Sequence, residues 1–133
     1  MNEKEIKIKF VSDWLGNFQQ VMKLPSVRLY AMEFPIKHGK EEYRVDILLE
    51  EDEFPIPMDN QLFVLEFKKD KIFHSALDQL NLYCETVGKK LYRKKEVIGM
   101  LAAPEFSTWE QQEAERQGRK CLQYDLNGNM RIL

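Results

Sequence analysis

The chain of 133 residues has the length of one domain, and its 44% hydrophobic residues are enough for a buried core. With 32% charged residues and a formal net charge of −2, it is not a wholly cationic nucleic-acid binder, although a local basic face remains open. It has no long apolar run, and Cys84 and Cys121 form no disulfide framework or local zinc motif. We also expect no secretory leader, because the first ten residues alternate charged and apolar side chains. We therefore expect a single intracellular, cytoplasmic domain over residues 1–133, without membrane contact.

The first half of the chain predicts one helix followed by strands. Apolar residues recur three or four positions apart over residues 3–23, which is typical of one helix face, and Pro25 ends the pattern. Strand-like segments then cover residues 27–36, 43–50 and 61–69. A turn at 38–40 and an acidic loop containing Pro55 and Pro57 separate these segments, so we expect them to form a meander.

The second half alternates helix and strand. We predict a helix over 72–92, a strand over 96–103, a helix over 108–117, a strand over 119–125 and a short edge strand at the end. Ser107 and Glu110 are spaced as a capping box, and Gly118 follows the last helix. The order α-β-β-β-α-β-α-β predicts an α/β fold with a mixed central sheet flanked by helices, because a parallel crossover follows the meander.

Charged residues occur inside two predicted core strands. Asp46 lies within the apolar run VDILL, and Glu66 and Lys68 lie near the end of LFVLEFK. Residues two apart in a strand share a face, so Glu66 and Lys68 point the same way, and Asp46 joins them if the strands pair. Two carboxylates and an ammonium there suit metal-assisted phosphodiester hydrolysis. An edge-strand ion pair, with Asp46 facing solvent, is the alternative.

The segment VLEFKKDKIFHSALDQLNLY places a strand ending in ExK before a helix that carries QLxxY. In residue type and order it resembles the PD-(D/E)XK nuclease superfamily, in particular its RecB-like and NucS-like branches. The similarity continues through GKEEYRVDILLE and from VIGMLAAP to CLQYDL, so it covers nearly the whole chain. The resemblance implies a restriction-endonuclease-like α-β-β-β-α-β core. One departure is Val45, which stands where many members have a proline before the aspartate.

The resemblance also implies roles for individual residues. Asp46 and Glu66 correspond to the ligands of a Mg²⁺ or Mn²⁺ ion, with the carbonyl of Phe67 completing the inner coordination. Lys68 corresponds to the catalytic lysine. Gln79 corresponds to a helix glutamine that orients water or contacts the nucleic-acid backbone, and an ordinary polar helix residue is the alternative.

The family often has a further catalytic glutamate on its first helix. Helical spacing favours Glu3, because Glu3 leads the apolar stripe and Glu5 falls on the opposite side. Glu3 lies very near the terminus, where chains fray, so its role stays open.

A nuclease also needs cationic contacts to phosphates, because these dominate affinity for nucleic acids. The candidate nucleic-acid contacts are Lys69, Lys71, Tyr83, Lys89 and Lys90. Each has a structural alternative, since lysines favour helix C-termini and Tyr83 could be a core aromatic. We expect the two histidines to be solvated and Trp109 to pack.

Together these features predict a Mg²⁺- or Mn²⁺-dependent DNA nuclease, and we favour an endonuclease. One alternative is a catalytically inactive nucleic-acid-binding or assembly module that retains the fold. Another is a small α/β interaction protein whose charges form only surface ion pairs. Cutting both strands of a duplex needs two active sites, which a homodimer would supply.

Overall fold

A computed structural model describes residues 1–51, 61–68, 72–90 and 96–133. The helices are α1 (Glu3–Asp13), α2 (Leu15–Val21), α3 (Phe73–Lys90) and α4 (Thr108–Arg116). The strands are β1 (Val27–His38), β2 (Glu41–Glu51), β3 (Gln61–Phe67), β4 (Glu96–Ala103), β5 (Lys120–Tyr124) and β6 (Met130–Ile132). The predicted acidic loop with its two prolines lies outside these residues. In the described part of the chain, no helix is long and apolar enough to cross a membrane.

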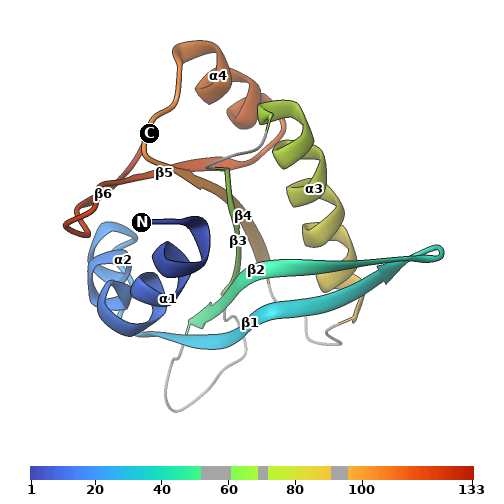
Figure 1. Cartoon of the computed structure of the whole chain (residues 1–133), viewed down its shortest axis with the longest axis horizontal. Helices are drawn as coiled ribbons and strands as arrows, with labels where there is room; N and C mark the ends of the chain where they lie inside the picture. Colours follow the sequence, from blue (N-terminus) through green and yellow to red (C-terminus); the bar gives the residue numbers. More distant parts are fainter. Residues whose placement is uncertain (52–60, 69–71, 91–95) are drawn as a thin grey trace.

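The strands form one sheet in the order β1-β2-β3-β4-β5-β6 (Figure 1). Pairing is antiparallel from β1 to β3, parallel from β3 to β5, and antiparallel again between β5 and β6. The helices α3 and α4 lie in the two connections between parallel strands, as such connections require. The prediction of an α/β fold with a mixed sheet flanked by helices is confirmed.

Helices cover both faces of the sheet, with α3 on one side and α1 and α2 on the other (Figure 1). Leu62 and Val64 of β3 pack in the core under α3, whereas Phe63 and Leu65 pack in the core under α1 and α2. Because side chains alternate along a strand, Glu66 belongs to the face covered by α3. A charged residue is thus placed in a strand that is buried on both faces.

The predicted single helix over residues 3–23 is wrong in one respect, because it breaks at Trp14 into α1 and α2. Trp14 leaves helical geometry with φ −107° and ψ 2°. Its indole packs against the turn between β5 and β6, where a Cβ on Gly128 would lie 2.6 Å from the ring. Asn17 of α2 donates to the Gly128 carbonyl at 2.9 Å. At the break, Trp14 and the start of α2 thus pack against the turn between β5 and β6. The apolar periodicity of the sequence continues through the break, so it gave no sign of it.

Candidate active site

Asp46 lies at an irregularity shared by β1 and β2. Val45 and Leu48 both pack in the core under α3, so the alternation of β2 shifts by one residue between them, at the position of Asp46. On β1, Glu33 lies between the paired residues Met32 and Phe34 and has a φ of 51°, in the left-handed region. A non-glycine residue in this region is uncommon and is typical of functional sites. The irregularity gives Asp46 an orientation that a regular strand would not provide.

The carboxylate of Asp46 is held against the end of β3. Its Oδ2 accepts a hydrogen bond of 2.9 Å from the backbone N–H of Phe67. Ile47 pairs with Leu65, so the register brings Asp46 next to Glu66. Asp46 is 5% exposed and Glu66 is 0% exposed, which excludes the alternative of a solvent-facing Asp46. Because β3 is a central strand, the edge-strand alternative is also wrong.

A lysine that sequence reasoning missed binds Asp46 from the opposite side. Lys7 of α1 donates to Asp46 Oδ1 at 3.1 Å and also forms an ion pair with Glu33. Burial lowers the pKa of Lys7, but its hydrogen bonds and the charges of Glu33 and Asp46 outweigh burial, so its pKa is raised. The available signal was its spacing, since Lys7 lies three residues before Phe10 on the apolar stripe of α1. Glu33, the partner of Lys7 on β1, had no feature in the sequence that marked it as part of the site.

Lys68 is bound by a glutamate from α4. Its Nζ lies 2.8 Å from Glu110 Oε2 and 5.8 Å from the ring centroids of Phe73 and Phe106. The other oxygen of Glu110 accepts from the Ser107 backbone N–H at 2.8 Å, which confirms the predicted capping box. Burial raises the pKa of Glu110, but the hydrogen bond from Lys68 and the other bonds to this carboxyl outweigh burial and lower it. The cap thus fixes the carboxylate that receives the lysine.

Tyr83 of α3 lies in the core on the sheet face that also carries Glu66, and it is affected by the charges of both site carboxylates. Burial, followed by the charges of Glu66 and Asp46, raises the pKa of its hydroxyl. The ring is 3% exposed and packs edge-on against Tyr43, with centroids 6.3 Å apart. Tyr83 therefore offers almost no surface to a nucleic-acid strand, and the structure places it in the core under α3.

The remaining candidate catalytic residues, Gln79 and Glu3, lie on α3 and α1. Gln79 is half-buried on α3, one turn before Tyr83. Glu3 begins α1, and its charge acts on Tyr124 of β5, whose pKa is raised to about 12 by burial and then by Glu3. Lys7, one turn after Glu3 on α1, contacts Asp46.

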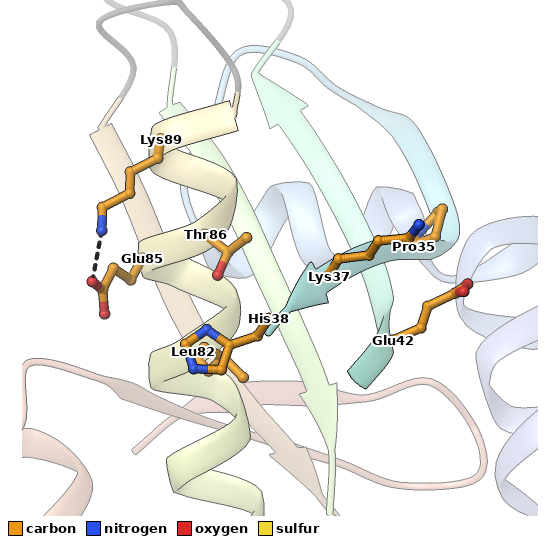
Figure 2. A pocket seen from close by; sticks show the side chains of 8 residues that line it. All are labelled: Pro35, Lys37, His38, Glu42, Leu82, Glu85, Thr86 and Lys89. Carbon is orange, nitrogen blue, oxygen red and sulfur yellow. Dashed lines mark hydrogen bonds and ion pairs between the residues drawn. The ribbon is translucent and has the colours of Figure 1, made fainter. Parts of the chain in front are cut away.

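The predicted phosphate contact Lys89 lies on a different part of the surface. It is exposed at the end of α3 and pairs with Glu85 at 3.0 Å. It lines a hollow of about 690 Å³ between α3 and the β1–β2 hairpin, together with Lys37, His38 and Glu42 (Figure 2). The mixed charges of this hollow do not form a purely basic path. Lys69, Lys71 and the side chain of Lys90 lie outside the described residues.

The oxygen donors of the cluster fit a hard divalent cation. Asp46 and Glu66 offer carboxylate oxygens, and the backbone carbonyl of Phe67 follows them at the same strand end. Among the described residues, no three histidine, cysteine, aspartate or glutamate side chains come together as a metal cage. Mg²⁺ does not require such a cage, because it is commonly held by one or two carboxylates with waters and substrate phosphates. Metal binding and catalysis by these residues stay predictions.

The fold of this chain occurs in solved endonuclease structures. No family model and no curated protein sequence matches the chain. A repair endonuclease from Pyrococcus abyssi is 21% identical and superimposes with a TM-score of 0.67 over 94% of this chain and 47% of its own. EndoMS, solved in a complex with double-stranded DNA, is 21% identical with a TM-score of 0.63, over 90% of this chain and 43% of its own.

An XisH family protein from Nostoc punctiforme is 12% identical, with a TM-score of 0.55, over 90% of this chain and 95% of its own. The chain therefore spans about half the length of the two endonucleases and nearly the full length of the XisH family protein. At these identities, the likeness establishes the fold.

Proposed function

We propose that the chain is a metal-dependent nuclease that hydrolyses phosphodiester bonds in DNA and acts as an endonuclease. The observation that carries this proposal is the 2.9 Å hydrogen bond from Phe67 N–H to Asp46 Oδ2. It holds a buried carboxylate of β2 against the strand end that carries Glu66 and Lys68. The repair endonucleases that share the fold support the reaction class, and the EndoMS complex with double-stranded DNA supports DNA as the substrate.

In this proposal Asp46 and Glu66 hold Mg²⁺ or Mn²⁺ together with the carbonyl of Phe67. Such an ion supplies an activated water and neutralises negative charge on the phosphate. Burial of both carboxylates supports this role, because buried charges are costly unless they are paired or coordinate a metal. Lys7 holds the carboxylate of Asp46 in place and neutralises part of its charge.

Lys68 is the proposed catalytic lysine. Its ammonium donates to one oxygen of Glu110, so it has further protons with which to bind a phosphate oxygen or the attacking water. Glu110 is a positioning residue, because it holds the ammonium at a fixed place beside the Phe73 ring. Gln79 and Glu3 are proposed to orient water or the nucleic-acid backbone, and Lys89 to contact a more distant phosphate.

Cleavage of defined nucleic acids tests this function. Labelled single-stranded, double-stranded and branched DNA, with RNA beside them, are incubated with the chain in Mg²⁺, Mn²⁺ or EDTA. We expect internal cleavage of DNA that requires metal and falls at least 100-fold in Lys68→Met, the order expected on losing a group that stabilises transition-state charge. Lys9→Met is the matched control, because Lys9 is an exposed lysine of α1 paired only with Asp13 among the described residues.

A second experiment measures metal binding directly, without relying on DNA cleavage. The midpoint temperature of thermal unfolding should rise with Mn²⁺ in the wild type, because a ligand that binds the folded state stabilises it. Asp46→Asn should remove this rise. Cleavage in EDTA, or cleavage unchanged in Lys68→Met, would overturn the proposed nuclease. Binding of DNA without cleavage would favour the inactive nucleic-acid-binding module instead.

A further inference from the structure

An exposed aromatic surface lies beside the candidate active site and has no part in the proposed hydrolysis. Trp109 of α4 is 53% exposed and Ile72, just before α3, is 76% exposed. His74 of α3, two residues after Ile72, is also exposed, and its ring centroid lies 5.6 Å from that of Trp109. We call these three residues the Trp109 patch. The expectation that Trp109 packs is correct in part, because its ring contacts Phe73 and His74 while the residue stays 53% exposed.

The patch has an ordered ring geometry. The Trp109 and Phe73 rings meet edge to face, with centroids 5.2 Å apart. The His74 and Trp109 rings are 5.6 Å apart and tilted by 37°. The buried ring of Phe73 thus holds Trp109 by a ring contact, and the exposed ring of His74 extends the aromatic surface. Trp109 is held by its neighbours while much of its area remains in water.

The patch is joined to the candidate active site through shared residues. Phe73, which contacts Trp109, also lies under the Lys68 ammonium at 5.8 Å. Trp109 directly precedes Glu110, the residue that binds Lys68 at 2.8 Å. A strand whose phosphate reaches Lys68 would therefore have its sugar and base within reach of Trp109. The combination of a phosphate-binding cation and an open aromatic face is the combination used for single-stranded nucleic acids.

We infer that the Trp109 patch stacks an unpaired nucleobase of the strand that is bound at Lys68. This inference rests on the proposed function and specifies its substrate as DNA with unpaired bases at the cleavage position. A base within a duplex has both faces covered by neighbouring pairs, whereas an unpaired or extruded base has a free face. Stacking on Trp109 does not read the base edge, so the preference is for unpaired DNA and not for a sequence.

The intrinsic fluorescence of the chain provides a direct test, because its two tryptophans differ in exposure. Trp14 is 3% exposed, so stacking of a bound base should quench mainly Trp109. In EDTA, we expect a thymidine 12-mer to quench this emission and a blunt duplex of the same length to quench it far less. An otherwise identical single strand with abasic sites at its central positions keeps the phosphates and should also quench weakly.

Affinity measurements with variants complete the test. We expect Trp109→Ala to weaken single-strand binding about tenfold, in line with the loss of one stacked base. Trp109→Phe should retain most of the affinity, and both variants should bind the blunt duplex like the wild type. Tyr30→Ala is the matched control, because Tyr30 is an aromatic residue on β1 that is 42% exposed. Trp109→Gln replaces Trp109→Ala if the latter fails to fold by circular dichroism.

The inference is overturned if Trp109→Ala binds the single strand with wild-type affinity, or if it loses affinity equally for the blunt duplex. If Lys68→Met abolishes cleavage while Trp109→Ala changes nothing, only this inference fails. If Trp109 stacks a base but no DNA is cut, the proposed hydrolysis fails and the binding site stands. If no nucleic acid binds at all, both fail.

Discussion

At the scale of single residues, Lys7 stabilises the fold because it supplies the positive charge between the carboxylates of Asp46 and Glu33. Its side chain is 11% exposed, and it binds Asp46, which is 7% exposed, and Glu33, which is 42% exposed. Lys7→Met keeps the length and apolar stem but leaves the two carboxylates facing each other without a cation. We expect the free energy of unfolding in urea at pH 7 to fall by about 2 kcal/mol, between the values typical of exposed and of fully buried pairs, because Glu33 is partly solvated.

The matched control for Lys7→Met is Lys9→Met on the same helix. Lys9 pairs with Asp13 at 2.6 Å, but both side chains are nearly half exposed, so its removal should cause no measurable loss. Adding Asp46→Asn to Lys7→Met should restore part of the lost stability by removing one of the uncompensated charges. Equal losses in the two lysine variants would contradict a special role for Lys7.

Glu110 gives a prediction that depends on pH. Its pKa is held below the ordinary value of 4.5, so the charged form stabilises the folded state above that value, and this stability is lost as pH falls through the folded pKa. Glu110→Gln can keep the capping box but removes the charge that faces Lys68. At pH 7 we expect it to lower the free energy of unfolding by about 1 kcal/mol after allowance for solvent screening.

The pH series for Glu110→Gln separates charge from capping. The difference from the wild type in urea unfolding should shrink as pH is lowered from 7 toward 3, because the wild-type carboxyl then becomes neutral as well. Glu110→Ala also removes the cap, so its loss should persist at the acid end of the series. If the difference in free energy of unfolding between the wild type and Glu110→Gln stays constant or grows at low pH, the ion pair with Lys68 does not stabilise the fold.

At the scale of elements, the break between α1 and α2 depends on the turn between β5 and β6. Gly128 has a φ of 84°, and a Cβ there would lie 2.6 Å from the Trp14 ring and 2.9 Å from Asn17 Nδ2. Gly128→Ala therefore combines backbone strain with a clash against a rigid ring. We expect a loss of about 3 kcal/mol in urea unfolding, the sum of a left-handed backbone cost and overpacking.

Gly118→Ala isolates the first of these two effects. Gly118 follows α4 with a φ of 76°, but a Cβ there has no neighbour within 4 Å. Its substitution should cost about 1 kcal/mol, from the backbone alone. If the two alanine variants lose the same stability, the contact between Trp14 and the turn does not contribute to the fold.

The sequence predicted those elements whose signals are local. The strand over 96–103 and the capping box of Ser107 and Glu110 were recovered because apolar patterning and cap residues act within a few positions. The break at Trp14 was missed, because the turn that Trp14 and Asn17 contact lies more than 100 residues away, at Gly128. The pattern of residues over a few positions cannot indicate a contact between segments so far apart in the sequence.

The same limit applies to the candidate site. Asp46, Glu66 and Lys68 could be selected because charges interrupt apolar strands, a conflict that often marks function. The contacts of Lys7 with Asp46 and Glu33 and of Glu110 with Lys68 were not predicted, because the packing of α1, β1 and α4 brings these residues together from separate elements. The left-handed backbone at Glu33 has no signature in residue type either, since glutamate does not favour that region.

At the scale of the whole molecule, each chain carries one set of Asp46, Glu66 and Lys68, whereas a DNA duplex has two strands. The chain also covers less than half of each of the two endonuclease chains that share its fold. One active site cuts one phosphodiester bond per encounter, so double-strand cleavage needs a second encounter or a second copy. A homodimer stays a proposal, and the products of plasmid cleavage can test it.

Supercoiled plasmid DNA distinguishes these routes, because one cut gives an open circle and two nearby cuts give a linear molecule. We expect open circles to accumulate first at low protein concentration, with linear DNA appearing as the concentration rises and two copies meet on one duplex. Gel electrophoresis of time courses over a 100-fold range of protein, beside sedimentation of the free chain, provides the measurement. A constant proportion of linear product at every dilution would contradict single-site nicking, because it requires an assembly with two active sites to form before DNA is bound.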